Sequence, residues 1–218
     1  MNRKTFLLLI SLISLSTLTI ASGNRWVKLF NGKNLDGWIQ KNGTATYRVE
    51  NGAIIGKTGK KSPNSFLCTE KEFGDFELKL EVKLINNELN SGIQIRSKTE
   101  NPGSDQKYGK VNGPQVEIEG GGLSGYIYAE AFNKWITPEN KLIRRKVLKK
   151  DKWNTFRIIA KGARIQTWIN GIQIENITDE EFYSSHPRGF IGLQVHGVGD
   201  LGPFEVAWRN IRIKELDK

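Results

Sequence analysis

Apolar and polar residues alternate with a period of two over most of the chain, a pattern typical of half-buried β-strands. The alternation is clearest in Phe76–Leu84, where every second residue is apolar and the residues between are Glu or Lys. Such a strand has one face in the core and one in water. Further strands are predicted at Tyr47–Val49, Ala53–Lys57, Gly92–Ser97, Gln115–Glu119, Tyr126–Glu130, Thr155–Lys161, Arg164–Asn170, Ile172–Glu175, Phe190–His196 and Phe204–Lys214.

Two Asn-Gly pairs and one capping pattern divide these strands. Asn51-Gly52 and Asn170-Gly171 each predict a hairpin with a type I′ turn, because both central positions of that turn need a positive φ. Thr178 followed three residues later by Glu181 resembles a capping box that opens one helical turn. Because the strands otherwise follow one another without helices, the pattern predicts an all-β, two-sheet sandwich of jelly-roll type.

Three of the predicted strands carry polar rows on the face opposite their apolar residues. The members of these rows are Gln94 and Arg96, then Gln115, Glu117 and Glu119, then Gln194 and His196. If the three rows share one concave face, they bring a guanidinium, a carboxylate and an imidazole into one cleft. Small residues beside them, Ser91, Gly92, Gly192 and Gly197, would let a substrate approach the backbone. The alternative is an ordinary solvent-facing sheet surface, which is also polar.

The N-terminal segment 1–22 has the three-part layout of a secretory signal. Arg3 and Lys4 precede the apolar run Phe6–Ile20, and small residues follow at Thr19-Ile20-Ala21. We therefore predict removal of this segment, a single domain over 23–218, and a periplasmic or secreted protein without stable membrane insertion. The alternative is an uncleaved anchor, although the run is short for a bilayer span.

Composition narrows the possible chemistry. The 218 residues include 33 Lys plus Arg and 23 Asp plus Glu, a formal charge of +10, with 38% hydrophobic residues. These values are those of a globular domain and exclude a disordered chain. The single cysteine, Cys68, excludes a disulfide framework and fits a buried, inert thiol.

Neither a cofactor nor a nucleic-acid partner is predicted. Two histidines without ligand spacing argue against a transition-metal site, whereas a structural calcium or other divalent ion stays open. The longest irregular stretch, Asn133–Lys152, ends in a basic segment at 141–152. That segment lacks the interleaved aromatic residues that stack bases, so it reads as a charged surface loop.

Several motifs in fixed order resemble the 3-keto-disaccharide hydrolase family. They are Trp26–Trp38, Phe73–Leu78, Asn90–Ser97, Gln115–Ile118, Trp153–Thr155, Trp168–Gly171, Gly192–Gly197 and Phe204–Ile213. The resemblance implies a concanavalin A-like jelly roll that acts on sugars oxidised at C3. The chain departs from the family pattern at Asn133–Lys152, which is longer and more basic than usual.

A ketone at C3 acidifies the C2 proton, so the implied reaction needs a base near C2 and positive charge near O3. We expect His196 to be the base, because its charge changes near neutral pH. Glu117 would orient His196 or replace it, and Arg96 would stabilise the oxyanion. The predicted substrate-binding residues are Gln94, Gln115, Gln194 and Glu119, with Trp168 as a platform for stacking the sugar.

Two other functions fit the same residues. A conventional glycosidase would use Glu117 and Glu119, which alternation places on one face of a strand. A noncatalytic carbohydrate-binding module would use the same cleft without chemistry, because a fold alone does not imply catalysis.

Overall fold

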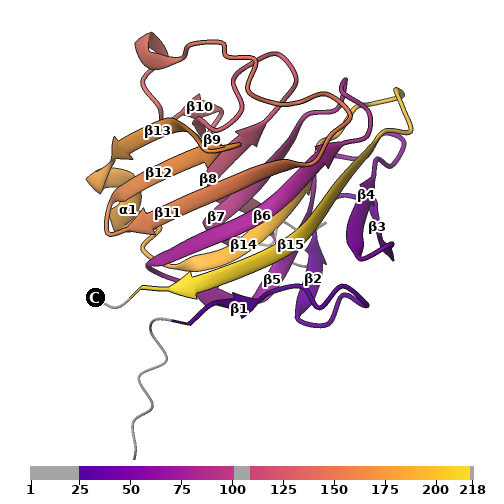
Figure 1. Ribbon diagram of the computed structural model, residues 1–218, viewed down its shortest axis with the longest axis horizontal. Helices are drawn as coiled ribbons and strands as arrows, with labels where there is room; N and C mark the ends of the chain where they lie inside the picture. The colour runs from indigo at the N-terminus through magenta and orange to yellow at the C-terminus, as the bar shows by residue number, and fades with distance from the viewer. Residues whose placement is uncertain (1–24, 101–108, 217–218) are drawn as a thin grey trace, which may run out of the picture.

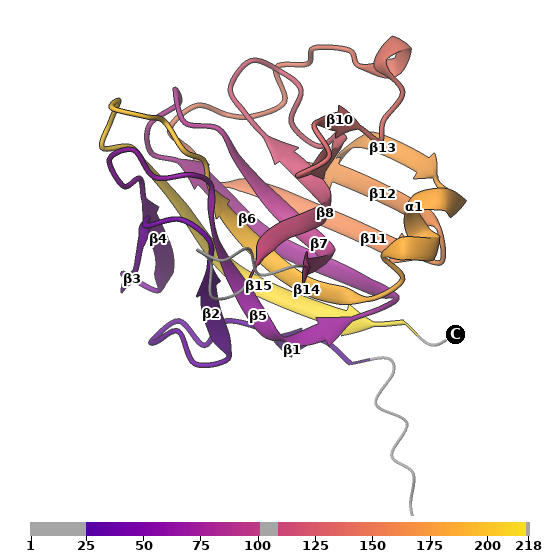
Figure 2. The same ribbon diagram turned by 180° about the vertical axis from the view of Figure 1, so that it is seen from behind.

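The structure, a computed structural model, describes residues 25–100 and 109–216. The predicted signal segment therefore lies outside the described residues. Within them, two antiparallel sheets pack face to face (Figures 1 and 2). The predicted all-β, two-sheet architecture is confirmed.

The first sheet has eight strands and faces the viewer in Figure 1. Its order is β13 (Ile172–Thr178), β12 (Arg164–Ile169), β11 (Asn154–Lys161), β6 (Phe76–Leu84), β15 (Glu205–Glu215), β4 (Ala53–Lys57) and β3 (Thr46–Glu50), with β1 (Val27–Lys28) paired to β15.

The second sheet has seven strands and lies behind the first, nearer the viewer in Figure 2. Its order is β10 (Lys134–Trp135), β9 (Ile127–Glu130), β8 (Lys110–Ile118), β7 (Ser91–Glu100), β14 (Gly189–Val195), β5 (Ser65–Phe73) and β2 (Trp38–Lys41). A 3-10 helix, Glu139–Lys141, and the helix α1, Glu180–Ser185, complete the described elements.

The core lies between the sheets and contains the apolar residues that alternation predicts. Leu78 and Leu80 of β6 pack in one cluster with Ile93 of β7 and Val116 of β8, and all four are almost fully buried. The residues between them, such as Lys79, point to the outer faces. Alternation therefore assigns each side chain to the core or to an outer face.

Both Asn-Gly hairpins are confirmed by their backbone angles. Asn51 and Gly52 have φ of 50° and 73°, and Asn170 and Gly171 have φ of 50° and 84°. The sequence pattern missed β5, however. Its residues 65–69 are all buried, because β5 is covered on both faces, so this part of the strand lacks a regular alternation.

The short helix begins one residue later than the capping pattern predicts. Thr178 is the last residue of β13, and Asp179 is the N-cap, whose carboxylate accepts from the Phe182 backbone N–H at 2.8 Å. Aspartate caps well because its short acceptor reaches the free amides of the first turn. Among the described residues, no helix is long and apolar enough to span a bilayer.

The predicted irregular stretch Asn133–Lys152 is confirmed as mostly loop, with only β10 and the 3-10 helix in it. The loop is hydrogen-bonded to the rest of the domain, because the Arg145 backbone N–H donates to Gly122 O at 2.8 Å. Cys68 is also buried as predicted, and burial raises the pKa of its thiol.

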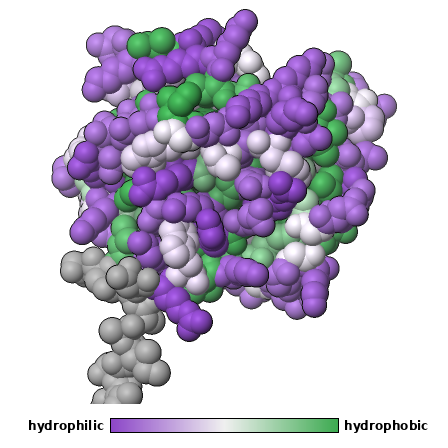
Figure 3. All heavy atoms as spheres, in the orientation of Figure 1, coloured by the Kyte–Doolittle hydropathy of each residue, from purple (hydrophilic) through white to green (hydrophobic). Residues whose placement is uncertain are grey.

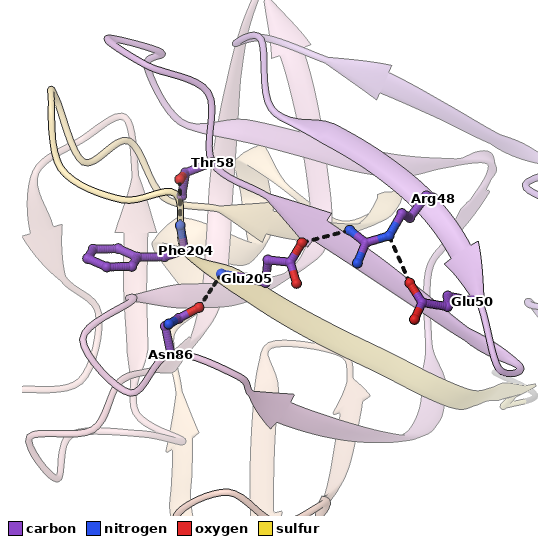
Figure 4. A network of polar contacts seen from close by, with 6 residues as sticks. All are labelled: Arg48, Glu50, Thr58, Asn86, Phe204 and Glu205. Atoms are coloured by element: carbon purple, nitrogen blue, oxygen red, sulfur yellow. Dashed lines mark hydrogen bonds and ion pairs between the residues drawn. The ribbon is translucent and has the colours of Figure 1, made fainter.

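The beginning of β15 is fixed by polar contacts (Figure 4). Asn86 Oδ1 accepts from the Glu205 backbone N–H at 2.9 Å, and Thr58 Oγ1 accepts from the Phe204 N–H at 3.0 Å. Arg48 of β3 binds the Glu205 carboxylate at 2.8 Å. These contacts join β3, β4 and β15 at one end of the eight-stranded sheet.

Candidate active site

A chain of hydrogen-bonded side chains crosses the outer face of the seven-stranded sheet. Ser97 Oγ donates to Gln94 Oε1 at 2.6 Å, Gln94 Nε2 donates to Gln115 Oε1 at 2.7 Å, and Gln115 Nε2 donates to Glu117 Oε2 at 3.0 Å. Gln94 is directly opposite Gln115 in the ladder of β7 and β8. The prediction that Gln94, Gln115 and Glu117 share a face is confirmed, and the chain of hydrogen bonds orients the Glu117 carboxyl.

Glu117 is a buried carboxyl with an unusual acidity. Its second oxygen accepts from Asn90 Nδ2. Burial raises the pKa of Glu117 to about 7, with smaller contributions from the charges of Glu119 and Glu130, while the hydrogen bonds from Gln115 and Asn90 oppose the shift. A carboxyl that titrates near neutrality is a candidate general base.

A second carboxyl, Glu130 of β9, lies on the same side. Its two oxygens accept from Asn64 Nδ2 at 3.1 Å and from Gln194 Nε2 at 3.2 Å. Burial raises the pKa of Glu130, and the Asn64 hydrogen bond and the charge of Lys110 oppose that rise. Because the Glu130 charge also raises the pKa of Glu117, the two carboxyls form one electrostatic unit.

A cavity of about 410 Å³ opens beside Glu130. Asn64, Phe66, Lys110 and Gly197 contribute to its wall. Lys110 is the single cation among the described residues that line it. The cavity therefore brings together a carboxyl, a lysine cation, amides and an aromatic ring.

Each carboxyl is held by an amide whose own oxygen is unsatisfied. Within the described residues, Asn90 Oδ1 and Gln194 Oε1 are buried and have no hydrogen-bond partner. A buried acceptor left unpaired costs about 1–3 kcal/mol. Asn90 and Gln194 therefore hold the two carboxyls at the cost of leaving their own oxygens unpaired.

His196 is close to this network but does not contact Glu117. Its Nδ1 lies 2.7 Å from Gly197 O, and a carbonyl only accepts, so Nδ1 carries the proton and Nε2 is unprotonated in the neutral ring. Burial lowers the pKa of His196. The prediction that Glu117 orients His196 is wrong, because the Glu117 oxygens accept from Gln115 and Asn90 instead.

The link between His196 and the site is indirect. The Gly197 N–H donates to Asn64 Oδ1 at 2.9 Å, and Asn64 in turn donates to Glu130. His196 thus sits beside the Glu130 half of the network.

Arg96 does not share the face of Gln94, contrary to the alternation pattern. Its φ is +50° at an irregularity in the pairing of β7 with β8, which turns the side chain away. The buried guanidinium donates to Gly74 O and Gly162 O, each at 2.7 Å, and to Asp75 Oδ1 at 2.9 Å. The predicted oxyanion-binding role therefore has no geometric support, and Arg96 is a structural residue.

Glu119 is likewise drawn out of the predicted row. β8 ends at Ile118, and the Glu119 carboxylate accepts from the backbone amides of Gly121 and Leu123 in the following turn. A carboxylate used to close a turn cannot pair with Glu117 as the second acid of a conventional glycosidase.

Trp168 lies on the opposite side of the molecule from its predicted place. It belongs to β12 of the eight-stranded sheet, where the Arg157 guanidinium sits 4.4 Å from its ring centroid. The site side instead carries Tyr128 and Trp135, directly opposite one another in the ladder, with ring centroids 5.2 Å apart. The charges of Glu130 and Glu117 raise the pKa of Tyr128 after the larger effect of burial, which places its hydroxyl near both carboxyls.

The small residues beside the polar rows pack against other side chains and backbone atoms of the protein. A Cβ on Gly92 would lie 2.3 Å from Gln115 Cδ, and one on Gly197 would lie 2.4 Å from Ser62 O. Ser91 Oγ donates to Gln194 O at 2.7 Å. The expected approach of a substrate to these positions is therefore blocked at Gly92 and Gly197 by neighbouring protein atoms.

The sequence analysis missed six residues of the site: Asn64, Asn90, Lys110, Tyr128, Glu130 and Trp135. A usable signal existed for two of them, because Tyr128 and Glu130 alternate with Ile127 and Ala129 of the core. Asn64 and Asn90 precede strands and follow no period.

The raised pKa of Glu117 predicts a stability difference that depends on pH. The pKa of Glu117 is 4.5 in the unfolded chain and about 7 in the folded protein, so the folded state holds the proton more tightly. The contribution of this group to the stability of the fold is therefore complete below pH 4.5 and is lost as pH rises to about 7. Relative to Glu117→Gln, the wild type should lose about 3 kcal/mol of unfolding free energy across that window. Urea denaturation of both proteins at the two ends of the window measures the difference. A constant difference would show that Glu117 titrates normally.

Among residues 25–100 and 109–216, no three His, Cys, Asp or Glu side chains gather closely enough to hold a metal ion. The site described above consists of carboxyls, amides, a lysine and aromatic rings.

The antiparallel sandwich with this polar outer face is that of a carbohydrate-active protein with a concanavalin-like jelly roll. The chain belongs to the family described as 3-keto-alpha-glucoside-1,2-lyase-like domain, whose model matches residues 25–214. The resemblance found in the sequence is thereby confirmed, and the family places the chain among glycoside hydrolase or lyase-type enzymes. No curated protein matches the chain.

Solved structures with low sequence identity share the fold. A Parabacteroides distasonis protein described provisionally as a glycosyl hydrolase is 22% identical, with a TM-score of 0.61 over 90% of this chain and 95% of its own. The carbohydrate-binding module CBM66 from Bacillus subtilis is 16% identical, with a TM-score of 0.58 over 83% of this chain and 97% of its own. The Bacillus licheniformis β-glucanase is 12% identical, with a TM-score of 0.60 over 89% of this chain and 99% of its own.

Proposed function

We propose that the protein cleaves the glycosidic bond of 3-keto-glycosides by removing the proton at C2, and that it does so in the periplasm or outside the cell. The family description names an elimination between C1 and C2, which supports the reaction class. The signal-like segment 1–22 supports the location.

The observation that carries the proposal is the Glu117 carboxyl. It is buried, oriented by two amides, and its pKa is raised to about 7. A carboxylate of that basicity is better matched to an acidic C–H than one with an ordinary pKa, because transfer efficiency rises with base strength. Glu117 therefore replaces His196 as the first candidate for the base.

The surrounding residues are assigned by their chemistry. Lys110 lines the cavity beside Glu130 and is the cation that we assign to the enolate oxygen at C3. Asn90 and Gln194 orient the two carboxyls by donating to Glu117 and to Glu130. Tyr128 and Trp135 offer aromatic faces beside the carboxyls.

The proposed reaction uses only Glu117 and water, and it needs no oxidant or reductant. Glu117 takes the C2 proton, and the electron pair of the C–H bond forms an enolate with the C3 carbonyl. The enolate re-forms the ketone while a double bond forms between C1 and C2 and the C1–O bond breaks. The departing oxygen takes a proton from water, and the hydroxide left behind takes the proton from Glu117, which restores the carboxylate. A second water adds across the enone, with its hydroxyl at C1 and its proton at C2, to give the free 3-keto sugar.

The test is incubation of the purified protein with a 3-keto-glucoside in deuterated water. We expect release of the aglycone together with deuterium at C2 of the sugar product. Release without deuterium would contradict proton removal at C2 and point to direct displacement. Sugar binding without release, from either 3-keto or unoxidised glycosides, would identify a binding module instead.

A further inference from the structure

The outer face of the eight-stranded sheet carries a row of four cations. Lys28, Arg212, Lys79 and Arg157 lie directly opposite one another on the consecutive strands β1, β15, β6 and β11. At the usual spacing between strands, this cation row spans roughly 14 Å. Like charges directly opposite one another destabilise a sheet, so the arrangement has an energetic cost.

The nearby carboxylates compensate only part of the cation row. Glu77 accepts from Arg157 Nε at 2.6 Å and pairs with Lys79 Nζ at 3.3 Å. Among the ion pairs of the described residues, none joins Lys28 or Arg212 to a carboxylate. Arg212 instead lies 5.3 Å from the ring centroid of Trp26.

The cation row lines a groove of about 790 Å³. Trp168, directly opposite Arg157, forms a further part of its wall. The groove lies on the face seen in Figure 3, where hydrophilic residues predominate and less polar ones show between them. A bulge in β15 between Arg209 and Arg212 interrupts the pairing with β6 beside the groove.

We infer that this groove is a second binding site, separate from the Glu117 site, and that its ligand is an oligosaccharide bearing carboxylates. Charge complementarity selects an anionic ligand, because cations outnumber carboxylates in the groove. The repeat of one cation per strand suits a polymer with regularly spaced anions. Arginine pairs well with carboxylates through its planar fork. The Arg157 guanidinium covers one face of the Trp168 indole, and the remainder of this half-buried ring gives the groove an apolar wall against which a pyranose ring can pack.

The inference does not depend on the proposed reaction. The groove and the Glu117 site are on outer faces of different sheets. An acidic chain held in the groove would tether the enzyme to a glycan without occupying the site where the sugar is cleaved.

The test measures binding of a galacturonate hexamer by calorimetry, with the fully methyl-esterified hexamer as the neutral matched probe. We expect at least tenfold tighter binding of the acidic hexamer, which weakens as salt screens the charges. Arg212→Ala should weaken binding about tenfold, the effect of one lost charged contact. Thermal unfolding should show that this variant is folded, because Arg212 leaves no carboxylate unpaired.

Two variants serve as matched controls. Arg164→Ala removes a cation from the same sheet face outside the groove and should leave binding unchanged. Glu117→Gln should also leave binding unchanged, because it alters the other sheet. Equal binding of both hexamers, loss of binding in Glu117→Gln, absence of binding, or tighter binding of oligothymidylate than of the acidic hexamer would each overturn the inference.

Discussion

Replacing Glu117 with Gln should lower kcat on a 3-keto-glucoside by about 10²–10⁴-fold, the usual contribution of a general base. The variant should remain folded, because glutamine keeps the shape of the side chain and its one oxygen can still accept from Gln115 Nε2. Its NH2 group takes the place of the oxygen that accepts from Asn90, and the Asn90 amide can turn over so that its unpaired Oδ1 accepts from that group. Steady-state kinetics on the purified variant measures the loss. Unchanged turnover would remove Glu117 from the mechanism.

The pH profile separates Glu117 from His196 as the base. If Glu117 is the base, kcat/KM of the wild type rises with pH to a plateau above about 7, because the carboxyl must be ionised. If His196 is the base, the rise lies below its ordinary value of 6.5, because burial lowers the pKa of the imidazole. The matched control is Glu119→Gln, two residues along, which should retain turnover since Glu119 closes a turn.

Replacing Arg96 with Met should lower the free energy of unfolding by about 3–5 kcal/mol, the usual cost of breaking a buried ion pair by removing one partner. The change leaves the Asp75 carboxylate without its cation and two backbone carbonyls, Gly74 O and Gly162 O, without their donor. Urea denaturation measures the loss, and the folded fraction should keep its turnover.

The matched control is Arg209→Met, which breaks the half-exposed ion pair of Arg209 with Glu81 at 2.5 Å. Such an exposed pair contributes about 0–1 kcal/mol. A stable Arg96→Met protein with lost turnover would instead return Arg96 to the catalytic role that the sequence pattern suggested.

The prediction of a shared polar face was correct where a strand is regular. Gln94, Gln115, Glu117 and Gln194 share a face because each alternates with core residues in a stretch where the pairing is continuous, over 91–94, 115–118 and 192–195. The prediction of Arg96 was wrong because one positive φ reverses the alternation for that residue. A period of two holds only while the backbone stays extended.

The sequence by itself determined most of the strands, the two Asn-Gly turns, the core face of each regular strand and the family. These depend on local alternation, on the φ that a turn demands and on motifs in fixed order, all of which are readable along the chain. Only the tertiary structure decided which sheet carries Trp168 and that Glu119 closes a turn. It also decided that Asn64 and Glu130 reach the Glu117 site. Alternation specifies the side of a strand that a residue occupies, whereas the packing of distant segments specifies what that side faces.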